Sequence, residues 1–255
     1  MLIIDIKNKL YNIFYILKAI KYYIKRNFLF CNKSLIIQRG ACLTNDSLKI
    51  SYPNANVLNF QKSRVDLLNA QYEYKCNPNL FDVSLVSPSL YNLYIDQFSG
   101  FWAKLHNKEV LIIDSYSELT DQLFINLKDN RIRFCANFSD VKSDFSDYYF
   151  CNGLLDNAEI YLNYDLFFSR IREVNPGLKI IYVFFPMGYE KRVKYINQNF
   201  FIEDAINKLV SKYHLTIIKV PDELLEVERE DDFPYHYNES VYKYIANKLN
   251  YTYDL

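Results

Sequence analysis

Short apolar runs recur along the chain, and each is bounded by polar residues, glycine or proline. Four of them occupy residues 34–39, 109–114, 179–185 and 215–220. Their centres are almost wholly apolar, which is typical of strands that are covered on both faces. The hydrophobic pattern therefore predicts four buried strands.

Two further stretches have the apolar spacing of helices. In residues 199–213 the repeating positions are Phe201, Ile202, Ala205, Ile206 and Leu209, and in residues 238–249 they are Val241, Tyr242, Ile245 and Leu249. Buried strands that alternate with helices indicate a parallel sheet with helices on both faces. We therefore expect an α/β fold, a three-layer sandwich with a mostly parallel sheet. Residues 50–108 and 130–175 are rich in Asn, Asp, Ser and Tyr, and we expect helices and long loops there.

The start of the chain differs from the rest in charge, since residues 1–30 hold six basic residues and one acidic residue. At about 100° per residue, one helical face carries Lys7, Lys18, Lys21 and Lys25, and another carries Ile13, Ile16, Leu17, Ile20 and Ile24. The pattern predicts a basic amphipathic arm over residues 1–30 and one α/β domain over residues 31–255. Two interpretations stay open. The apolar stripe packs on the domain or on a second subunit of a homo-oligomer, or the helix lies on an anionic membrane surface.

Composition and charge narrow the class of protein. Apolar residues make up 50% and charged residues 24%, which is typical of a globular domain, and Lys+Arg 30 balances Asp+Glu 30, which argues against a nucleic-acid partner. The high content of Tyr 24 and Phe 19 is explained either by the codon bias of an AT-rich genome or by tyrosines that line a sugar-binding cleft. The sequence shows no signal peptide and no uncharged apolar run of about 18 residues. We expect a cytoplasmic location, with the arm as the candidate contact with the inner face of the membrane.

The cysteines and glycines exclude several kinds of site. None of the five cysteines forms a C-x-x-C pair, which disfavours a zinc site and a disulfide framework. No glycine-rich phosphate loop is present, which disfavours nucleotide hydrolysis and dinucleotide binding. We expect no metal and no tightly bound cofactor.

Cys42 is the first candidate for chemistry. It follows the predicted strand 34–39 in the run Gly-Ala-Cys-Leu-Thr over residues 40–44. Ligands of parallel sheets bind at the carboxyl ends of the strands, and the amino end of a following helix would stabilise the Cys42 thiolate. The alternative is a buried cysteine that serves as a small apolar residue.

His236 is the matching candidate for a general base. It precedes the predicted helix 238–249, and the positive end of a helix keeps an imidazole neutral and able to accept a proton. Asp232 is close enough in sequence to orient the ring. The alternative is a simple hydrogen bond of His236 near the start of the helix. A cysteine nucleophile, a histidine base and an aspartate that orients the base form the general arrangement of nucleophilic catalysis.

Stabilisation of an oxyanion needs donors beside the nucleophile. Backbone amides near Cys42, including the region of Ala41, are the first candidates. The loop after strand 109–114 supplies the others, namely Ser115 and Ser117, with Asp114 as a further substrate-binding candidate. A second role for Asp114, as the cap of the next helix, is equally compatible with the sequence.

These motifs resemble the SGNH (GDSL-type) hydrolase superfamily, in particular its divergent bacterial branch associated with capsular polysaccharide biosynthesis. That branch opens with a Gly-Ser-Cys-Val-Thr-Arg-Asp-like motif, and the corresponding run here is Gly-Ala-Cys-Leu-Thr-Asn-Asp over residues 40–46. The closing Asp-x-x-His motif corresponds to residues 232–236, with one residue more between Asp232 and His236. Residues 60–65, Phe-Gln-Lys-Ser-Arg-Val, are similar to a further stretch of the branch. The Gly-x-Asn-Asp block of the superfamily is absent, and Ala41 replaces a polar residue.

The resemblance implies an SGNH or flavodoxin-like fold and transfer of an acyl group, most simply acetyl, to or from capsular or other cell-surface polysaccharide. Cys42 matches the nucleophile and His236 the base. Acetyl-CoA is a candidate acyl donor, and a sugar or polysaccharide is the expected partner. The alternative is a catalytically silent protein of the same fold that binds glycan or serves as a scaffold in capsule assembly. Glycosyl or phosphoryl transfer is a third hypothesis, which the absence of nucleotide-sugar and metal signatures disfavours.

Overall fold

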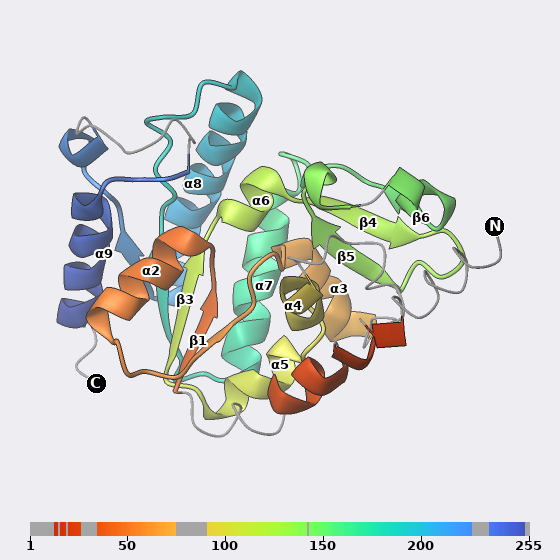
Figure 1. The fold of residues 1–255 in the computed structure, drawn as a ribbon. Helices are drawn as coiled ribbons and strands as arrows, with labels where there is room; N and C mark the ends of the chain where they lie inside the picture. Colours follow the sequence, from red (N-terminus) through yellow and green to blue (C-terminus); the bar gives the residue numbers. More distant parts are fainter. Residues whose placement is uncertain are drawn as a thin grey trace.

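A five-stranded parallel sheet forms the centre of the molecule (Figure 1). The computed structural model describes residues 13–14, 16–18, 20–26, 35–74, 91–141, 143–225 and 235–252. The strands are β1 (Ile36–Arg39), β2 (Val57–Asn59), β3 (Val110–Asp114), β7 (Lys179–Val183) and β8 (Leu215–Ile218). Their order in the sheet is β2-β1-β3-β7-β8, and every neighbouring pair is parallel. The four predicted strands are confirmed, and β2 is an additional strand at the edge of the sheet.

Helices cover both faces of this sheet. The helices α2 (Cys42–Ser51) and α9 (Glu239–Thr252) pack side by side on one face. On the other face lie α3 (Val65–Tyr74), α7 (Ile160–Val174) and α8 (Val193–Tyr213). The arrangement is a three-layer α/β sandwich, as the alternation of apolar strands and helices predicts. The helix α8 begins six residues earlier than predicted, because the apolar residues of its first turns, including Val193 and Ile196, face solvent and give no core pattern.

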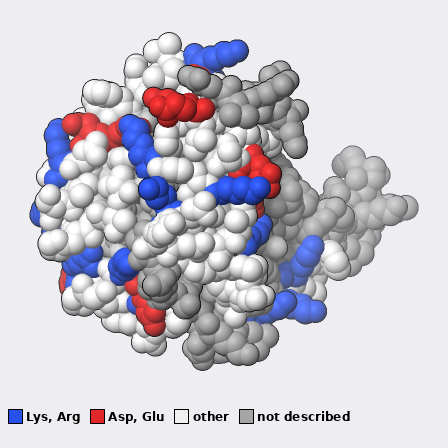
Figure 2. Space-filling view, turned by 90° about the vertical axis from the view of Figure 1, so that its left-hand side faces the viewer, with Lys and Arg blue, Asp and Glu red and all other residues white. Residues whose placement is uncertain are grey.

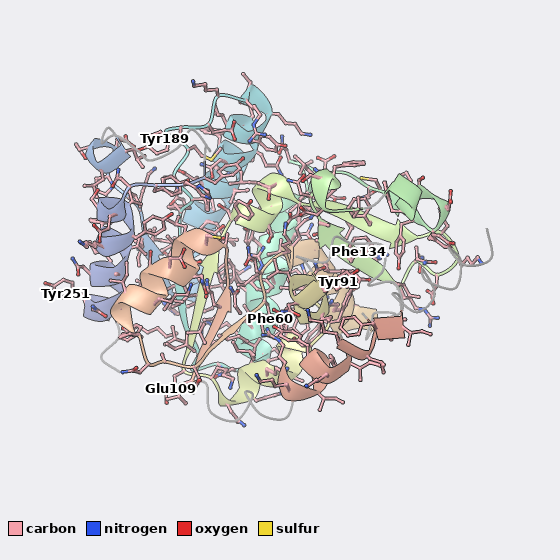
Figure 3. All side chains as sticks on the ribbon, viewed as in Figure 1. Phe60, Tyr91, Glu109, Phe134, Tyr189 and Tyr251 are labelled. Carbon is pink, nitrogen blue, oxygen red and sulfur yellow. The ribbon has the colours of Figure 1, made fainter. Side chains whose placement is uncertain are left out.

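A second, smaller sheet lies beside the main one. It contains β4 (Gln122–Asn126), β5 (Arg133–Ala136) and β6 (Tyr149–Cys151), which are antiparallel and in the order β5-β4-β6. Buried aromatic rings fill the space between this sheet and α4 (Tyr91–Asp96), and Figure 3 labels two of them, Tyr91 and Phe134. The expectation of helices and long loops for residues 130–175 is therefore wrong in part, since β5 and β6 lie there.

Short helices complete the described chain. Two follow α4 in sequence, α5 (Phe101–Lys104) and the 3-10 helix Leu105–Asn107, and α6 (Tyr116–Thr120) follows β3. The other 3-10 helices are Phe138–Asp140, Ser143–Asp147 and Asp222–Leu225. Among them, α6 matters most for function, because it starts at the carboxyl edge of the main sheet.

The described part of the N-terminal arm, within residues 13–26, is helical and lies along the outer edge of the molecule, drawn in red at the lower right of Figure 1. It contacts the domain through Tyr22, whose hydroxyl donates to Asp96, and through Arg26, which pairs with Asp96 at 2.9 Å. The apolar stripe of the helix faces solvent, since Ile13 and Leu17 are 53% and 61% exposed. The stripe therefore does not pack on the domain.

Two features of the described residues concern possible partners, namely the charges on the surface and the apolar character of the helices. Figure 2 shows that Lys and Arg alternate with Asp and Glu on the face that carries α9, amid mostly uncharged atoms. Within the described ranges, no helix combines the length and the apolar character needed to cross a bilayer.

Candidate functional site

The order of the strands singles out one place on the sheet. From β1 the chain crosses to β2 on one side, and it later returns to β3 on the other side of β1. In a parallel sheet, such a change of direction leaves a crevice between the carboxyl ends of the two neighbouring strands, where ligands bind. Here Gly40, Ala41 and Cys42 follow β1, and Asp114, Ser115 and Tyr116 end or follow β3. Most of the predicted site residues therefore meet at one edge of the sheet.

Asp114 holds the turn between β1 and α2. Its buried carboxylate accepts hydrogen bonds from the Ala41 backbone N–H at 2.9 Å and from the Thr44 hydroxyl at 2.7 Å. It also accepts from the Tyr116 N–H at 3.1 Å, and so caps the first turn of α6. Burial raises the pKa of Asp114 to about 6, although these hydrogen bonds and Arg39 work in the opposite direction. The turn that presents Cys42 is thus fixed by a carboxylate from the next strand.

Gly40 is required by this close approach. A Cβ atom at position 40 would lie 2.1 Å from Thr44 Oγ1 and 2.7 Å from Asp114 Oδ2. The side chain of Asn59, at the end of β2, bonds both sides of the same residue, since Asn59 Nδ2 donates to the Gly40 carbonyl at 3.2 Å and Asn59 Oδ1 accepts from the Gly40 N–H at 3.5 Å. Three strands therefore contribute to one tightly packed turn.

Cys42 is the first residue of α2, and its side chain is exposed. The residue at the N-cap is Ala41, which has no side-chain acceptor, so the first-turn amides of α2 lack the usual side-chain cap. Partial removal from water and the carboxylates of Asp46 and Asp114 raise the pKa of the Cys42 thiol. This direction is opposite to the one expected from the helix amino end alone, because removal from water, with the two nearby negative charges, outweighs the effect of the helix. At neutral pH the resting group is therefore the thiol.

His236 lies three residues before α9, and its side chain is exposed. Its neighbours are anchored to the carboxyl edge of the sheet, since the Tyr237 hydroxyl donates to the Pro186 carbonyl at 2.7 Å and the Tyr235 ring packs on Tyr116 at 5.4 Å. Tyr189, labelled in Figure 3, stacks on Tyr237 at 5.8 Å. Within the residues that the structure describes, no hydrogen bond joins Cys42 to His236.

The helices α2 and α9 bring the two candidates to the same edge. They pack side by side, with the Ser51 hydroxyl donating to the Ala246 carbonyl at 2.9 Å and the Tyr52 hydroxyl to the Leu249 carbonyl at 3.2 Å. Both helices start at the carboxyl edge and run back along the sheet (Figure 1). Asp232, the predicted partner of the histidine, lies outside the described residues.

The predicted oxyanion and substrate-binding residues are buried. Ala41 is 4% exposed, and its N–H already donates to Asp114. Ser115 is the N-cap of α6, and its buried hydroxyl finds no hydrogen-bond partner in the described part of the chain. Ser117 is also buried, and its carbonyl accepts from the Asp121 N–H at 3.0 Å. These side chains are therefore shielded from solvent, whereas those of Cys42 and His236 are exposed.

Tyr116 is a site residue that the sequence analysis did not single out. Its ring lies between Phe185 at 5.4 Å and Tyr235 at 5.4 Å, and its phenol interacts electrostatically with Cys42 and Lys62. Burial raises the pKa of the Tyr116 phenol, so it remains a hydrogen-bond donor at neutral pH. Its position directly after the strand-ending Asp114-Ser115 pair was the signal in the sequence.

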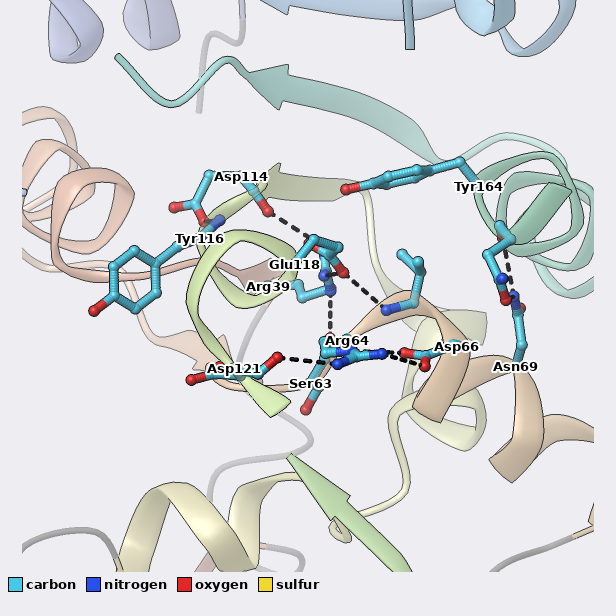
Figure 4. Close-up of polar contacts among 12 residues, drawn as sticks. Arg39, Ser63, Arg64, Asp66, Asn69, Asp114, Tyr116, Glu118, Asp121 and Tyr164 are labelled. Atoms are coloured by element: carbon cyan, nitrogen blue, oxygen red, sulfur yellow. Dashed lines mark hydrogen bonds and ion pairs between the residues drawn. The ribbon is translucent and has the colours of Figure 1, made fainter. Parts of the chain in front are cut away.

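A buried charge network supports the edge from beneath (Figure 4). Arg39, the last residue of β1, is 1% exposed and forms an ion pair with Glu118 of α6. The Arg39 guanidinium also donates to the carbonyls of Ser63 and Asp114. Glu118 in turn accepts from the Val65 N–H at 2.9 Å. One arginine thus joins the loop after β2, the end of β3 and the helix α6.

The loop after β2 continues this network. Lys62, at a positive φ of 62°, places its ammonium 3.0 Å from Asp121 and 3.0 Å from Asp140. Arg64 pairs with Asp66 and donates to the carbonyls of Asp121 and Gly153. Residues 60–65 therefore join the main sheet to the small one. Among the described residues, no cluster of His, Cys, Asp and Glu side chains could hold a metal ion.

Comparisons with known proteins give a partial likeness to solved structures alone. No family model matches the chain. No curated protein matches it either. Among solved structures, the chain is similar to an acetyl xylan esterase from the rumen bacterium Butyrivibrio proteoclasticus, with a TM-score of 0.37 and 14% identity over 86% of this chain. The chain spans 62% of the length of that protein.

Proposed function

We propose that the chain is an acyltransferase or esterase in which Cys42 is the nucleophile and His236 the general base. The observation that carries the proposal is the placement of Cys42. Its thiol is exposed at the amino end of α2, beside the carboxyl ends of β1 and β3, on a turn that the buried Asp114 holds in place. An exposed thiol on a rigid turn at the ligand-binding edge of a parallel sheet suits nucleophilic attack.

The raised pKa of Cys42 decides the form of the first step. Because the resting group is a thiol, its proton must leave while the bond to the substrate forms. Cys42 Sγ attacks the acyl carbonyl carbon, and the imidazole of His236 accepts the thiol proton. The carbonyl then re-forms, the leaving alcohol or thiol takes the proton from His236, and an acyl-Cys42 thioester remains. A sugar hydroxyl or water next attacks the thioester, gives its proton to His236 and restores the thiol of Cys42.

The oxyanion formed in each step needs donors beside Cys42 Sγ. The Ala41 N–H is engaged by Asp114, so the backbone N–H groups of Cys42 and Leu43 in the uncapped first turn of α2 are the donors we assign. The Tyr116 phenol, which interacts electrostatically with Cys42, is the further donor. Ser115 and Ser117 support the turn and do not contact the substrate.

The resemblance to the capsule-associated branch supplies the substrate class in this proposal. The acceptor or substrate is a capsular or other cell-surface polysaccharide, and acetyl-CoA in the cytoplasm is the candidate donor. Asp232 orients His236 through the nitrogen that does not accept the proton. Transfer and hydrolysis share every step except the last, in which a sugar hydroxyl or water attacks the thioester.

A catalytically silent protein is the second candidate, and two observations favour it. The Cys42 thiol has a raised pKa, and no hydrogen bond to His236 prepares it within the described residues. In this alternative the carboxyl edge binds glycan without chemistry, and the chain is a scaffold in capsule assembly.

The two candidates differ in turnover. The assay follows release of p-nitrophenol from p-nitrophenyl acetate, and of CoA from acetyl-CoA with capsular oligosaccharides as acceptors. If the chain is an acyltransferase or esterase, Cys42→Ala should abolish product release and His236→Ala should lower kcat/KM roughly 10²- to 10⁴-fold. Cys151→Ala is the matched control, since Cys151 is a free thiol outside the site, and it should leave turnover unchanged. Equal turnover in the native chain and in Cys42→Ala rejects the proposal in favour of the silent one.

A further inference from the structure

The N-terminal helix presents a continuous apolar stripe to solvent. Of the predicted apolar positions, Ile16 is half-buried. We define the stripe as the other four, Ile13, Leu17, Ile20 and Ile24, which are 53%, 61%, 36% and 51% exposed, with Phe14 beside them at 62%. The spacing of four, three and four residues places the stripe along one side of the helix. An apolar side that remains exposed over the described length of a helix indicates a surface that binds something outside the chain.

The opposite side of the helix is fixed to the domain. At about 100° per residue, Tyr22 and Arg26 lie roughly 150–170° around the helix from the stripe. Tyr22 donates to Asp96, while Arg26 pairs with Asp96, donates to the Ser99 hydroxyl at 2.9 Å and lies over the Phe60 ring at 4.9 Å. The domain therefore holds the helix so that the stripe points outward.

Lysines line one flank of the stripe. Lys18, Lys21 and Lys25 are exposed and lie about 70–130° from its centre. Residues 13–26 contain no acidic residue. An outward apolar stripe with a basic flank is complementary to the interface of an anionic bilayer, where apolar side chains enter the acyl region and ammonium groups meet lipid phosphates.

A second copy of the helix fits this surface less well. Pairing two stripes would bring two sets of lysines together with no acidic side chain on either helix to offset the repulsion. Residues 16–26 also carry Lys18, Lys21, Lys25 and Arg26, so this part of the helix suits the plane of a bilayer interface better than its apolar core.

We propose that the helix of residues 13–26 is an interfacial anchor that binds the chain to an anionic lipid bilayer, with the stripe inserted and the lysines at the phosphates. The anchor is also joined to the candidate active site. Arg26 donates to the Asn59 carbonyl, and the Asn59 side chain bonds the Gly40 backbone in the turn before Cys42. The docked arm therefore sets the orientation of the carboxyl edge relative to the membrane.

The test is flotation of the full chain with vesicles of phosphatidylcholine, with and without phosphatidylglycerol. The native chain should float with the anionic vesicles and remain unbound with the neutral ones. Leu17→Glu/Ile24→Glu should abolish flotation. The matched control is Leu162→Glu/Phe200→Glu, which changes two apolar residues of α7 and α8 that are 65% and 69% exposed, and it should float as the native chain does.

The lysines are tested separately. Lys18→Gln/Lys21→Gln should lower the partition coefficient roughly fivefold for each lysine, while Lys49→Gln/Lys208→Gln, on α2 and α8, should not change it. The denaturation midpoint of every variant is measured as well, and it should equal that of the native chain because all these side chains are exposed.

Three results would overturn the proposal. The first is a folded native chain that stays unbound with anionic vesicles. The second is a Leu17→Glu/Ile24→Glu variant that floats like the native chain. The third is a dimer, seen by light scattering, that the same variant dissociates while neither protein binds vesicles, which would assign the stripe to a second copy. Hydrolysis of a soluble ester should be unaffected by the stripe variant, so this inference and the proposed function fail independently.

Discussion

Gly40→Ala tests the geometry of the turn that presents Cys42. The new Cβ atom would lie 2.1 Å from Thr44 Oγ1 and 2.7 Å from Asp114 Oδ2, so both groups must move by about 1 Å to reach ordinary contact. That movement breaks or lengthens the Thr44–Asp114 bond of 2.7 Å and the Ala41–Asp114 bond of 2.9 Å. Overpacking costs about 1–3 kcal/mol, and each hydrogen bond to a carboxylate about 1.5 kcal/mol. Because these costs are not additive, we expect a loss of about 3–5 kcal/mol in the free energy of unfolding.

Urea denaturation of Gly40→Ala and of a matched control, Gly177→Ala, measures this loss. At Gly177 the nearest atom to a new Cβ is 3.9 Å away, so this variant should differ from the native chain by less than about 1 kcal/mol. The Gly40→Ala variant should also lose acyl transfer at temperatures where it is folded, because the Cys42 turn has moved. A loss below about 1 kcal/mol for Gly40→Ala, equal to that of the control, would refute the role assigned to Asp114 and Thr44.

Three further predictions concern charge. Arg39→Met should lower the free energy of unfolding by about 3–5 kcal/mol, because it leaves the buried Glu118 without its ion-pair partner. Adding Glu118→Gln should recover part of this loss. Arg131→Met, which breaks an exposed ion pair, should cost at most about 1 kcal/mol in the same urea assay. Asp114 has a pKa of about 6 in the folded chain and of about 3.9 in the unfolded chain, so the native state binds more protons between these pH values. The contribution of Asp114 to the free energy of unfolding therefore falls by up to about 3 kcal/mol as the pH rises from 4 to 7. Denaturation across this range should show a weaker fall for Asp114→Asn, and an unchanged fall would contradict the assignment. The raised pKa of Cys42 means that its alkylation by iodoacetamide, followed by mass spectrometry, should accelerate only above the pH at which a free cysteine reacts, and a fast reaction below pH 7 would reverse that direction.

The central sheet was readable from the sequence because its strands are buried on both faces. The runs that became β3, β7 and β8 are mostly apolar, and the run that became β1 is apolar at its centre, a pattern that follows from burial. The edge strand β2 has three residues and alternating burial, so it gave no comparable run. The antiparallel strands β4, β5 and β6 are three to five residues long, and their aromatic residues pack on α4, a contact between distant segments that local patterns do not contain.

The sequence of the helix α7 contains the apolar periodicity of a buried helix, although no helix was predicted at these residues in particular. Ile160, Tyr164, Phe167, Phe168 and Ile171 recur at helical spacing and are all buried. They lie within residues 130–175, where the content of Asn, Asp, Ser and Tyr gave only the general expectation of helices and long loops. The apolar stripe of the N-terminal helix shows the opposite case, because its periodicity was clear but its direction depended on the docking of Tyr22 and Arg26 to Asp96.

The candidate site was predictable in position and not in detail. Strand ends place Cys42 and Asp114 at one edge, as the general rule for parallel sheets requires. The direction of the Cys42 pKa depends on how far the thiol is removed from water and on how close two carboxylates lie to it. The burial of Ser115 and Ser117 depends on how α6 packs, so neither property could be predicted from sequence spacing. The roles of Cys42, His236 and Asp232 remain predictions.

Acylation of Cys42 in a single turnover tests the central claim most directly. The native chain and His236→Ala are mixed with p-nitrophenyl acetate at neutral pH, and acetylation of each cysteine is followed over time by peptide mass spectrometry, with the free thiol of Cys151 as internal reference. We predict that Cys42 is acetylated faster than Cys151 in the native chain, and that His236→Ala slows this roughly 10²- to 10⁴-fold without changing Cys151. Acetylation of Cys42 at the rate of Cys151, or at the same rate in both proteins, would contradict the assignment of nucleophile and base.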